Sequence, residues 1–108
     1  MARILVVEDD SDQLSMRKQI LEHAGHEVVT AETAAEAIAQ LAGCQVVVMD
    51  LQIPTLQAGL GLIQAASGST RIVVLSGAAA ETELPVDEFL TKPCSSKKLL
   101  EVIAKFTA

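Results

Sequence analysis

The chain has 108 residues, half of them hydrophobic, and carries a formal net charge of −6 with a pI near 4.7. This length fits one domain, the acidic balance argues against a nucleic-acid-binding surface, and no apolar run reaches the roughly 18 residues of a membrane span. With no secretory signal pattern visible either, we expect a single cytoplasmic domain over residues 1–108 that binds neither nucleic acid nor membrane.

Short apolar runs alternate with segments of helical periodicity along the chain. Runs rich in β-branched and aliphatic residues predict five strands, at residues 3–7, 27–31, 44–49, 71–75 and 86–90. Apolar residues at helical spacing predict four helices, at residues 11–24, after Thr33, around 60–66 and after Ser95. Strands that alternate with helices are typical of a parallel sheet covered on both faces.

Capping signals mark where the helices begin and end. Gly25 and Gly43 follow the first two helices, as C-terminal caps do. Thr33 and Glu36 form a capping box that opens the second helix, with Ala37, Ile38 and Leu41 on its apolar face. Ser95 or Ser96 caps the last helix, whose buried stripe we expect to contain Leu99, Leu100, Val102, Ile103 and Phe106.

Charged residues stand where three of the predicted strands end. Asp50 closes the run 46–49, the cluster Glu8-Asp9-Asp10 closes the run 4–7, and Lys92 follows Phe89-Leu90. The carboxyl ends of parallel strands meet at one edge of the sheet, where α/β proteins place their ligands. Carboxylates suit a hard divalent cation, and a lysine beside them suits a phosphoryl group. The pattern therefore predicts a site for both.

Four segments, in this order, resemble the receiver domain of two-component response regulators, of the chemotaxis-regulator type. They are the opening strand with its acids (residues 4–10) and the phosphoacceptor segment (48–54). The other two are the fourth strand with its hydroxyl residue (74–77) and the switch aromatic with its Lys-Pro pair (86–93). The resemblance covers nearly the whole chain. It implies a doubly wound, flavodoxin-like α/β fold whose five parallel strands have the order 2-1-3-4-5.

The resemblance also assigns a role to each residue of the phosphorylation site. Asp50 is the residue phosphorylated by a histidine kinase or a histidine phosphotransfer protein. Lys92 pairs with Asp50 and then with the phosphoryl oxygens, Ser76 hydrogen-bonds the phosphoryl group, and Phe89 changes rotamer with it. The peptide bond between Lys92 and Pro93 is cis in the family. Ser76 as a turn residue and Phe89 as a core residue remain the alternatives.

A magnesium ion, with manganese as a substitute, is the implied cofactor. Asp9 and Asp50 bind it directly, the backbone carbonyl of Gln52 completes the protein ligands, and Glu8 acts through a bound water. Asp10 fits better as the N-terminal cap of the first helix. The two cysteines have no metal spacing, and we expect both to be small buried or half-buried hydrophobes. The alternative for Cys94 is a pKa lowered by its neighbour Lys92.

The connection between Ser76 and Lys92 is several residues shorter than is usual in the family. The segment 77–85 replaces a connection that normally contains a full helix, and Pro85 biases the residue before it away from helical angles. We therefore expect this fourth helix to be short or absent. Output would then pass through the loop or through another face, such as the first helix with Arg17 and Lys18.

Three functions compete on these features. The first is a phosphorylatable switch that binds a kinase, a phosphotransfer protein or a downstream target, with self-phosphorylation and auto-dephosphorylation as its only enzymatic activities. The second is an adaptor or phosphate sink without a conventional output, which the short 77–85 segment favours. The third, a dehalogenase-like hydrolase, wants a second acid two residues after the nucleophile, where this chain has Gln52. A homodimer stays open.

Overall fold

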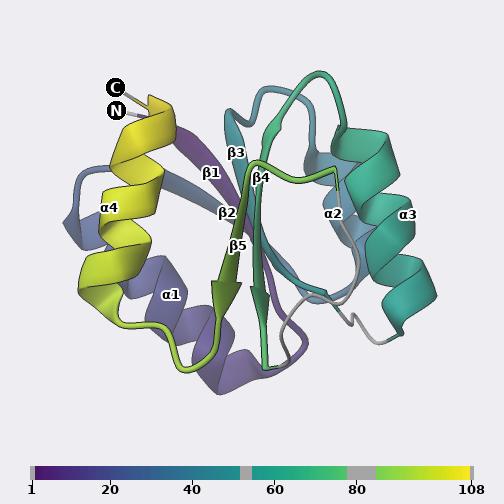
Figure 1. The fold of residues 1–108 in the computed structure, drawn as a ribbon. Helices are drawn as coiled ribbons and strands as arrows, with labels where there is room; N and C mark the ends of the chain where they lie inside the picture. The colour runs from purple at the N-terminus through teal and green to yellow at the C-terminus, as the bar shows by residue number, and fades with distance from the viewer. Residues whose placement is uncertain (1, 52–54, 78–84, 108) are drawn as a thin grey trace.

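Strands and helices alternate in the computed structural model, which describes residues 2–51, 55–77 and 85–107 (Figure 1). The strands are β1 (Arg3–Val7), β2 (Glu27–Ala31), β3 (Val46–Asp50), β4 (Arg71–Ser76) and β5 (Glu88–Thr91). The helices are α1 (Ser11–His23), α2 (Ala34–Gln40), α3 (Leu56–Ala66) and α4 (Ser96–Thr107). The predicted short or absent helix before β5 falls on residues 78–84, outside the described part of the chain.

The five strands form one parallel sheet in the order β2-β1-β3-β4-β5, which confirms the predicted α/β fold. Helices α1 and α4 cover one face, and α2 and α3 cover the other (Figure 1). Successive strand residues point to opposite faces, so each strand serves both cores. Residues packed on the α2–α3 side include Leu5, Val7, Val47, Met49, Ile72 and Val74. Those on the α1–α4 side include Ile4, Val6, Val46, Val48, Val73 and Leu75.

The helix caps follow the sequence signals. Thr33 accepts a hydrogen bond from the backbone N–H of Glu36 at 3.1 Å, and Ser95 Oγ accepts one from the backbone N–H three residues later, also at 3.1 Å. Gly25 and Gly43 have φ angles of 96° and 83°, a region that residues with a Cβ rarely adopt. These hydrogen bonds mark the beginnings of α2 and α4, and the two glycines follow the ends of α1 and α2.

One apolar helix position differs from the sequence expectation. Ile38, predicted on the apolar face of the second helix, is 44% exposed. Ala34 and Ala37 make the contact of α2 with the sheet, so Ile38 is left at the rim of this helix. In α3 the buried contacts come from Leu62, Ile63 and Ala66.

Helix α3 is longer than predicted, because it begins at Leu56 rather than near Leu60. The reason is a cap: Thr55 Oγ1 accepts a hydrogen bond from the backbone N–H of Ala58 at 3.1 Å. One residue later, Gly59 faces the end of β3, where a Cβ would lie 1.9 Å from the carbonyl oxygen of Leu51. Only glycine permits this approach of α3 to the sheet.

Strand β5 begins at Glu88 rather than at the predicted Val86. Before it, Asp87 accepts a hydrogen bond from the backbone N–H of Ile72 at 2.7 Å and one from Arg71 at 3.1 Å, while its own N–H donates to the Ile72 carbonyl at 2.9 Å. The Asp87 carboxylate thus replaces a backbone acceptor, and the regular ladder starts one residue later.

Candidate phosphoryl and metal site

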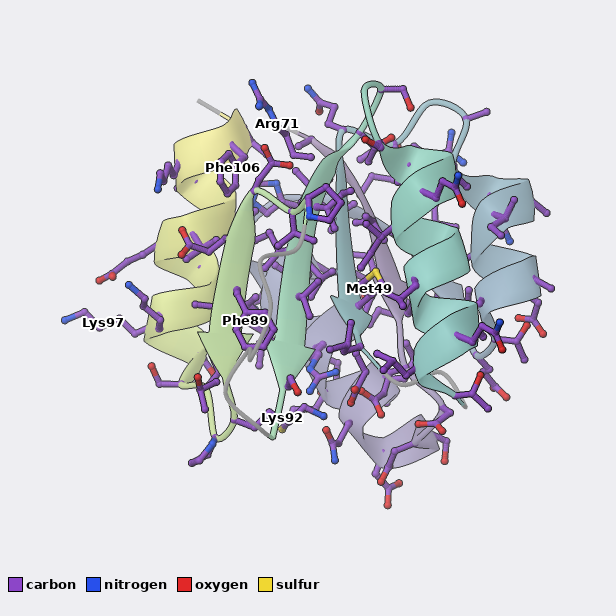
Figure 2. The ribbon with its side chains drawn as sticks, turned by 45° about the vertical axis from the view of Figure 1, so that its right-hand side comes forward. Met49, Arg71, Phe89, Lys92, Lys97 and Phe106 are labelled. Atoms are coloured by element: carbon purple, nitrogen blue, oxygen red, sulfur yellow. The ribbon has the colours of Figure 1, made fainter. Side chains whose placement is uncertain are left out.

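The sheet register brings the predicted site residues to one edge. Val7 pairs with Met49, Asp50 pairs with Leu75, and Ser76 pairs with Thr91. The strands all end near these pairs. The same end of the sheet therefore holds the acids that follow β1, the acid that ends β3 and the lysine that follows β5. Figure 2 shows Lys92 at this end of the sheet, beyond Phe89.

Asp50 and Lys92 are in direct contact. The Nζ atom of Lys92 donates a hydrogen bond to Oδ2 of Asp50 at 2.5 Å. Their side chains are 19% and 25% exposed, so the pair is partly shielded from water and open on one side. A half-buried carboxylate beside an ammonium group is the arrangement that phosphoryl transfer to aspartate requires.

Glu8 lies deeper than the sequence suggested. It is 2% exposed, and its Oε2 accepts a hydrogen bond from Nη1 of Arg17 at 2.6 Å. The same oxygen lies 3.9 Å from Nζ of Lys92, and Oε1 accepts the backbone N–H of Asp10 at 3.2 Å. Lys92 therefore lies between two carboxylates, and Glu8 has a second cation of its own.

Arg17 is the site residue that sequence reasoning missed. It is 7% exposed and also donates from Nη2 to Oε1 of Gln13 at 3.0 Å, whereas the sequence assigned it to an output face of the first helix. Its spacing was the available signal: Arg17 stands three residues after Leu14 and four before Leu21, and both leucines are buried. Residues at this spacing share one face of a helix.

The three acids of the cluster Glu8-Asp9-Asp10 have different surroundings. Asp10 Oδ1 accepts hydrogen bonds from the backbone N–H groups of Asp12 at 2.9 Å and Gln13 at 3.2 Å. This confirms Asp10 as the N-terminal cap of α1. Asp9, in contrast, is exposed at the site. Of the cluster, one acid caps a helix, one is buried against Arg17, and one faces solvent.

The remaining predicted residues lie on β4, on β5 and just after β5. Ser76 is half-buried at the end of β4, and its carbonyl accepts the backbone N–H of Lys92 at 2.7 Å. Phe89 is half-buried and packs against the core on the α2–α3 side. The Lys92–Pro93 peptide bond is cis, as the resemblance implies.

The carboxylates near Lys92 are few, and this limits which metal ion they could hold. Among the described residues, no group of three or more His, Cys, Asp or Glu side chains is placed to hold a metal ion. Magnesium, however, keeps several waters and uses one or two carboxylates, so the predicted pair of Asp9 and Asp50 would be sufficient in number. Gln52, the third predicted ligand, lies outside the described residues.

A cavity of about 430 Å³ lies between α1 and α4, next to the site. Met16, Ile20 and Leu99 give it an apolar wall, and Arg17 and Lys92 line the side toward the site. The cavity therefore connects the polar groups of the site with the helix pair on one face of the sheet.

The alternative of a lowered pKa for Cys94 was wrong in direction. Burial raises the pKa of the Cys94 thiol above its ordinary value of 9.0, and this outweighs the lowering by Arg17 and Lys98. Burial raises the pKa of Cys44 as well. At both thiols the effect of burial exceeds that of the nearby cations, so neither has the lowered pKa of a reactive cysteine.

We expect Cys94 to react slowly with iodoacetamide near neutral pH, because the thiolate is the reactive form. The alkylation rate should still be rising at pH 9, since the raised pKa leaves the thiol largely protonated below that value. Peptide mass spectrometry of samples quenched over a pH series measures this rate. A rate that levels off below pH 8 would contradict the raised pKa.

Comparison with known proteins agrees with this geometry. The sequence model of the response regulator receiver domain matches residues 4–104. A CheY-like receiver domain protein from Methanospirillum hungatei JF-1 has a similar structure, with a TM-score of 0.86 and 29% identity over 97% of this chain and 92% of that one. The chemotaxis response regulator CheY4 of Vibrio cholerae has a TM-score of 0.85 and 27% identity over 98% of both chains.

A receiver domain from Clostridium thermocellum is similar too, with a TM-score of 0.80 and 25% identity over 97% of this chain and 93% of that one. No helix in the described ranges is long and apolar enough to cross a membrane. The family match, the strand order and the Asp50–Lys92 contact agree with one another, and the chain belongs to the response regulator receiver domain family.

Proposed function

We propose that this receiver domain is a phosphorylatable switch in which Asp50 accepts a phosphoryl group in a Mg²⁺-dependent reaction. The donor would be a sensor histidine kinase or a histidine phosphotransfer protein in the cytoplasm. The contact of 2.5 Å between Lys92 Nζ and Asp50 Oδ2 carries this proposal, because it places a cation where negative charge develops during transfer.

The site residues divide the work of phosphoryl transfer. An oxygen of Asp50 forms a bond to phosphorus while the bond from phosphorus to the donor's leaving group breaks. Lys92 is then close enough to follow the phosphoryl oxygens, and the Ser76 hydroxyl would donate a hydrogen bond to one of them. Phe89, which is half-buried on the α2–α3 side of β5, would change rotamer in response.

Magnesium would neutralise charge on the phosphoryl oxygens when it is bound. Asp9 and Asp50 would hold it through carboxylate oxygens, with the backbone carbonyl of Gln52 as a third ligand and Mn²⁺ as a substitute metal. A contact from Glu8 through a water stays a prediction, because the Glu8 carboxylate also has Arg17 as its partner.

An adaptor or phosphate sink without a conventional output is the alternative. The short sequence between Ser76 and Lys92 favours it, because the family uses a full helix in this connection to report phosphorylation. A phosphate sink still requires phosphorylation of Asp50, whereas a non-switching adaptor only has to bind the kinase. Both differ from the switch in that no downstream target binds the phosphorylated form more tightly. A pull-down with unmodified and phosphorylated protein separates them.

Acetyl phosphate with Mg²⁺ should add one phosphoryl group to the protein, and chelation of the metal should prevent it. Asp50→Asn should abolish the mass increase, because the amide oxygen is a poor nucleophile. Asp10→Asn is the matched control: it changes a neighbouring acid that caps α1, and it should be phosphorylated like the wild type. Intact-mass spectrometry measures the adduct, and an adduct that persists in Asp50→Asn would refute the assignment.

A further inference from the structure

Arg17 places a buried guanidinium inside an acidic site. The side chains of Arg17 and Glu8 are only 9% and 3% exposed, and their charged atoms are 2.6 Å apart. We infer that Arg17 competes with the hydrated divalent cation for the Glu8 carboxylate and thereby keeps the affinity of the site for that cation low. This inference rests on the proposed metal site.

Protein donors already occupy both oxygens of Glu8. Oε2 accepts from Arg17 and lies 3.9 Å from Lys92 Nζ, and Oε1 accepts from the backbone N–H of Asp10. A metal-bound water would have to share the Glu8 carboxylate with these donors. Breaking a buried ion pair is costly unless another positive charge replaces the lost one. The hydrated cation and the guanidinium therefore compete for the same negative charge.

The net charge of the site points the same way. Glu8, Asp9 and Asp50 contribute three negative charges, and Arg17 and Lys92 offset two of them. Without Arg17 the site would carry two net negative charges instead of one. A divalent cation gains electrostatic energy from each uncompensated carboxylate nearby, most strongly where burial reduces screening.

The cavity between α1 and α4 can accommodate the Arg17 guanidinium in a second position. Arg17 lines this space of about 430 Å³ as well as contacting Glu8. Rotation of its side chain into this space would release Glu8 while the guanidinium stays beside Gln13, which lines the same cavity. The exchange between guanidinium and cation thus needs no movement of α1 itself.

Binding of Mn²⁺, followed through the EPR signal of the free ion, tests the competition directly. The chain has no tryptophan or tyrosine, so the metal itself is the probe. Arg17→Met should tighten Mn²⁺ binding roughly tenfold, because it removes one positive charge close to the cation in a partly buried site. Lys18→Met removes an equal charge from the exposed neighbouring position and should change the affinity by less than about twofold.

A second substitution separates competition from bulk charge. In the double variant Glu8→Gln with Arg17→Met, the gain in affinity should largely disappear, because the released carboxylate is missing. Arg17→Lys keeps the charge and should bind Mn²⁺ about as weakly as the wild type. An unchanged affinity in Arg17→Met, or an equal gain with and without Glu8→Gln, would overturn the inference.

Two further outcomes are decisive. If Arg17→Met is unfolded without metal, added Mn²⁺ should restore its circular dichroism spectrum, since the cation replaces the lost guanidinium. Failure at every Mn²⁺ concentration would count against the inference. Absence of Mn²⁺ binding in every variant and in the wild type would instead contradict the proposed metal site, whereas wild-type binding with no effect of Arg17 would contradict this inference alone.

Discussion

Replacing Lys92 by methionine should slow phosphorylation of Asp50 by acetyl phosphate by roughly 10²- to 10³-fold, the loss typical when one preorganised charge-stabilising group is removed. Lys92 donates to Asp50 at 2.5 Å and lies 3.9 Å from Glu8, so methionine leaves two carboxylates without their shared cation. The rate of appearance of the phosphoryl adduct, at saturating Mg²⁺, measures the effect.

Lys97→Met is the matched control for this experiment. Lys97 is exposed on α4, and Figure 2 shows its side chain pointing away from the sheet. The control makes the same chemical change on the same side of the molecule and should phosphorylate within about twofold of the wild type, since exposed charges are strongly screened. A Lys92→Met protein that folds and phosphorylates at the control rate would remove Lys92 from the mechanism.

Replacing Gly59 by alanine should lower the free energy of unfolding by about 3 kcal/mol or more, at the upper end of overpacking substitutions. Its Cβ would lie 1.9 Å from the carbonyl oxygen of Leu51 and 2.9 Å from the carbonyl carbon. Both atoms belong to the backbone, so the clash can be relieved only by moving α3 or the Leu51 peptide that follows β3. Because Leu51 follows Asp50, phosphorylation should slow as well.

Gly61 offers a control two residues away in the same helix. An added Cβ at Gly61 has nothing within 4 Å, so Gly61→Ala should stabilise the protein by about 0.5–1 kcal/mol through helix propensity alone. Thermal unfolding should show opposite shifts, with a fall of roughly 10 °C or more for Gly59→Ala, at about 4–8 °C per kcal/mol in a domain of this size. Similar shifts for both variants would contradict the close approach.

Sequence reasoning succeeded where the chain itself restricts the answer. Runs such as Ile4–Val7 and Val46–Met49 are short, apolar and rich in β-branched residues, which is typical of buried strands, and alternation with helices favours a parallel sheet. Once the strands are parallel, residues that follow them must meet at one edge. Asp50, Glu8 and Lys92 could therefore be placed together before any coordinates were known.

The features that were missed depend on contacts between distant segments. Arg17 looks like a surface residue of α1 until the acid opposite it is known, although its spacing from Leu14 and Leu21 places it on the buried face. Gly59 has a helical neighbourhood, and only the position of Leu51 explains why a side chain is excluded. Ile38 was misplaced because the periodicity of a helix does not say how closely it approaches the sheet.

Asp87 makes the position of Lys92 independent of the length of the connection between β4 and β5. Its contacts with Ile72 and Arg71 anchor the start of β5 from one side, and the pairing of Ser76 with Thr91 fixes the other. The position of Lys92 opposite Asp50 is therefore set by the sheet and not by the number of residues that connect β4 to β5. Evolution can lengthen or shorten that connection to suit a new partner while the chemistry at Asp50 is inherited unchanged.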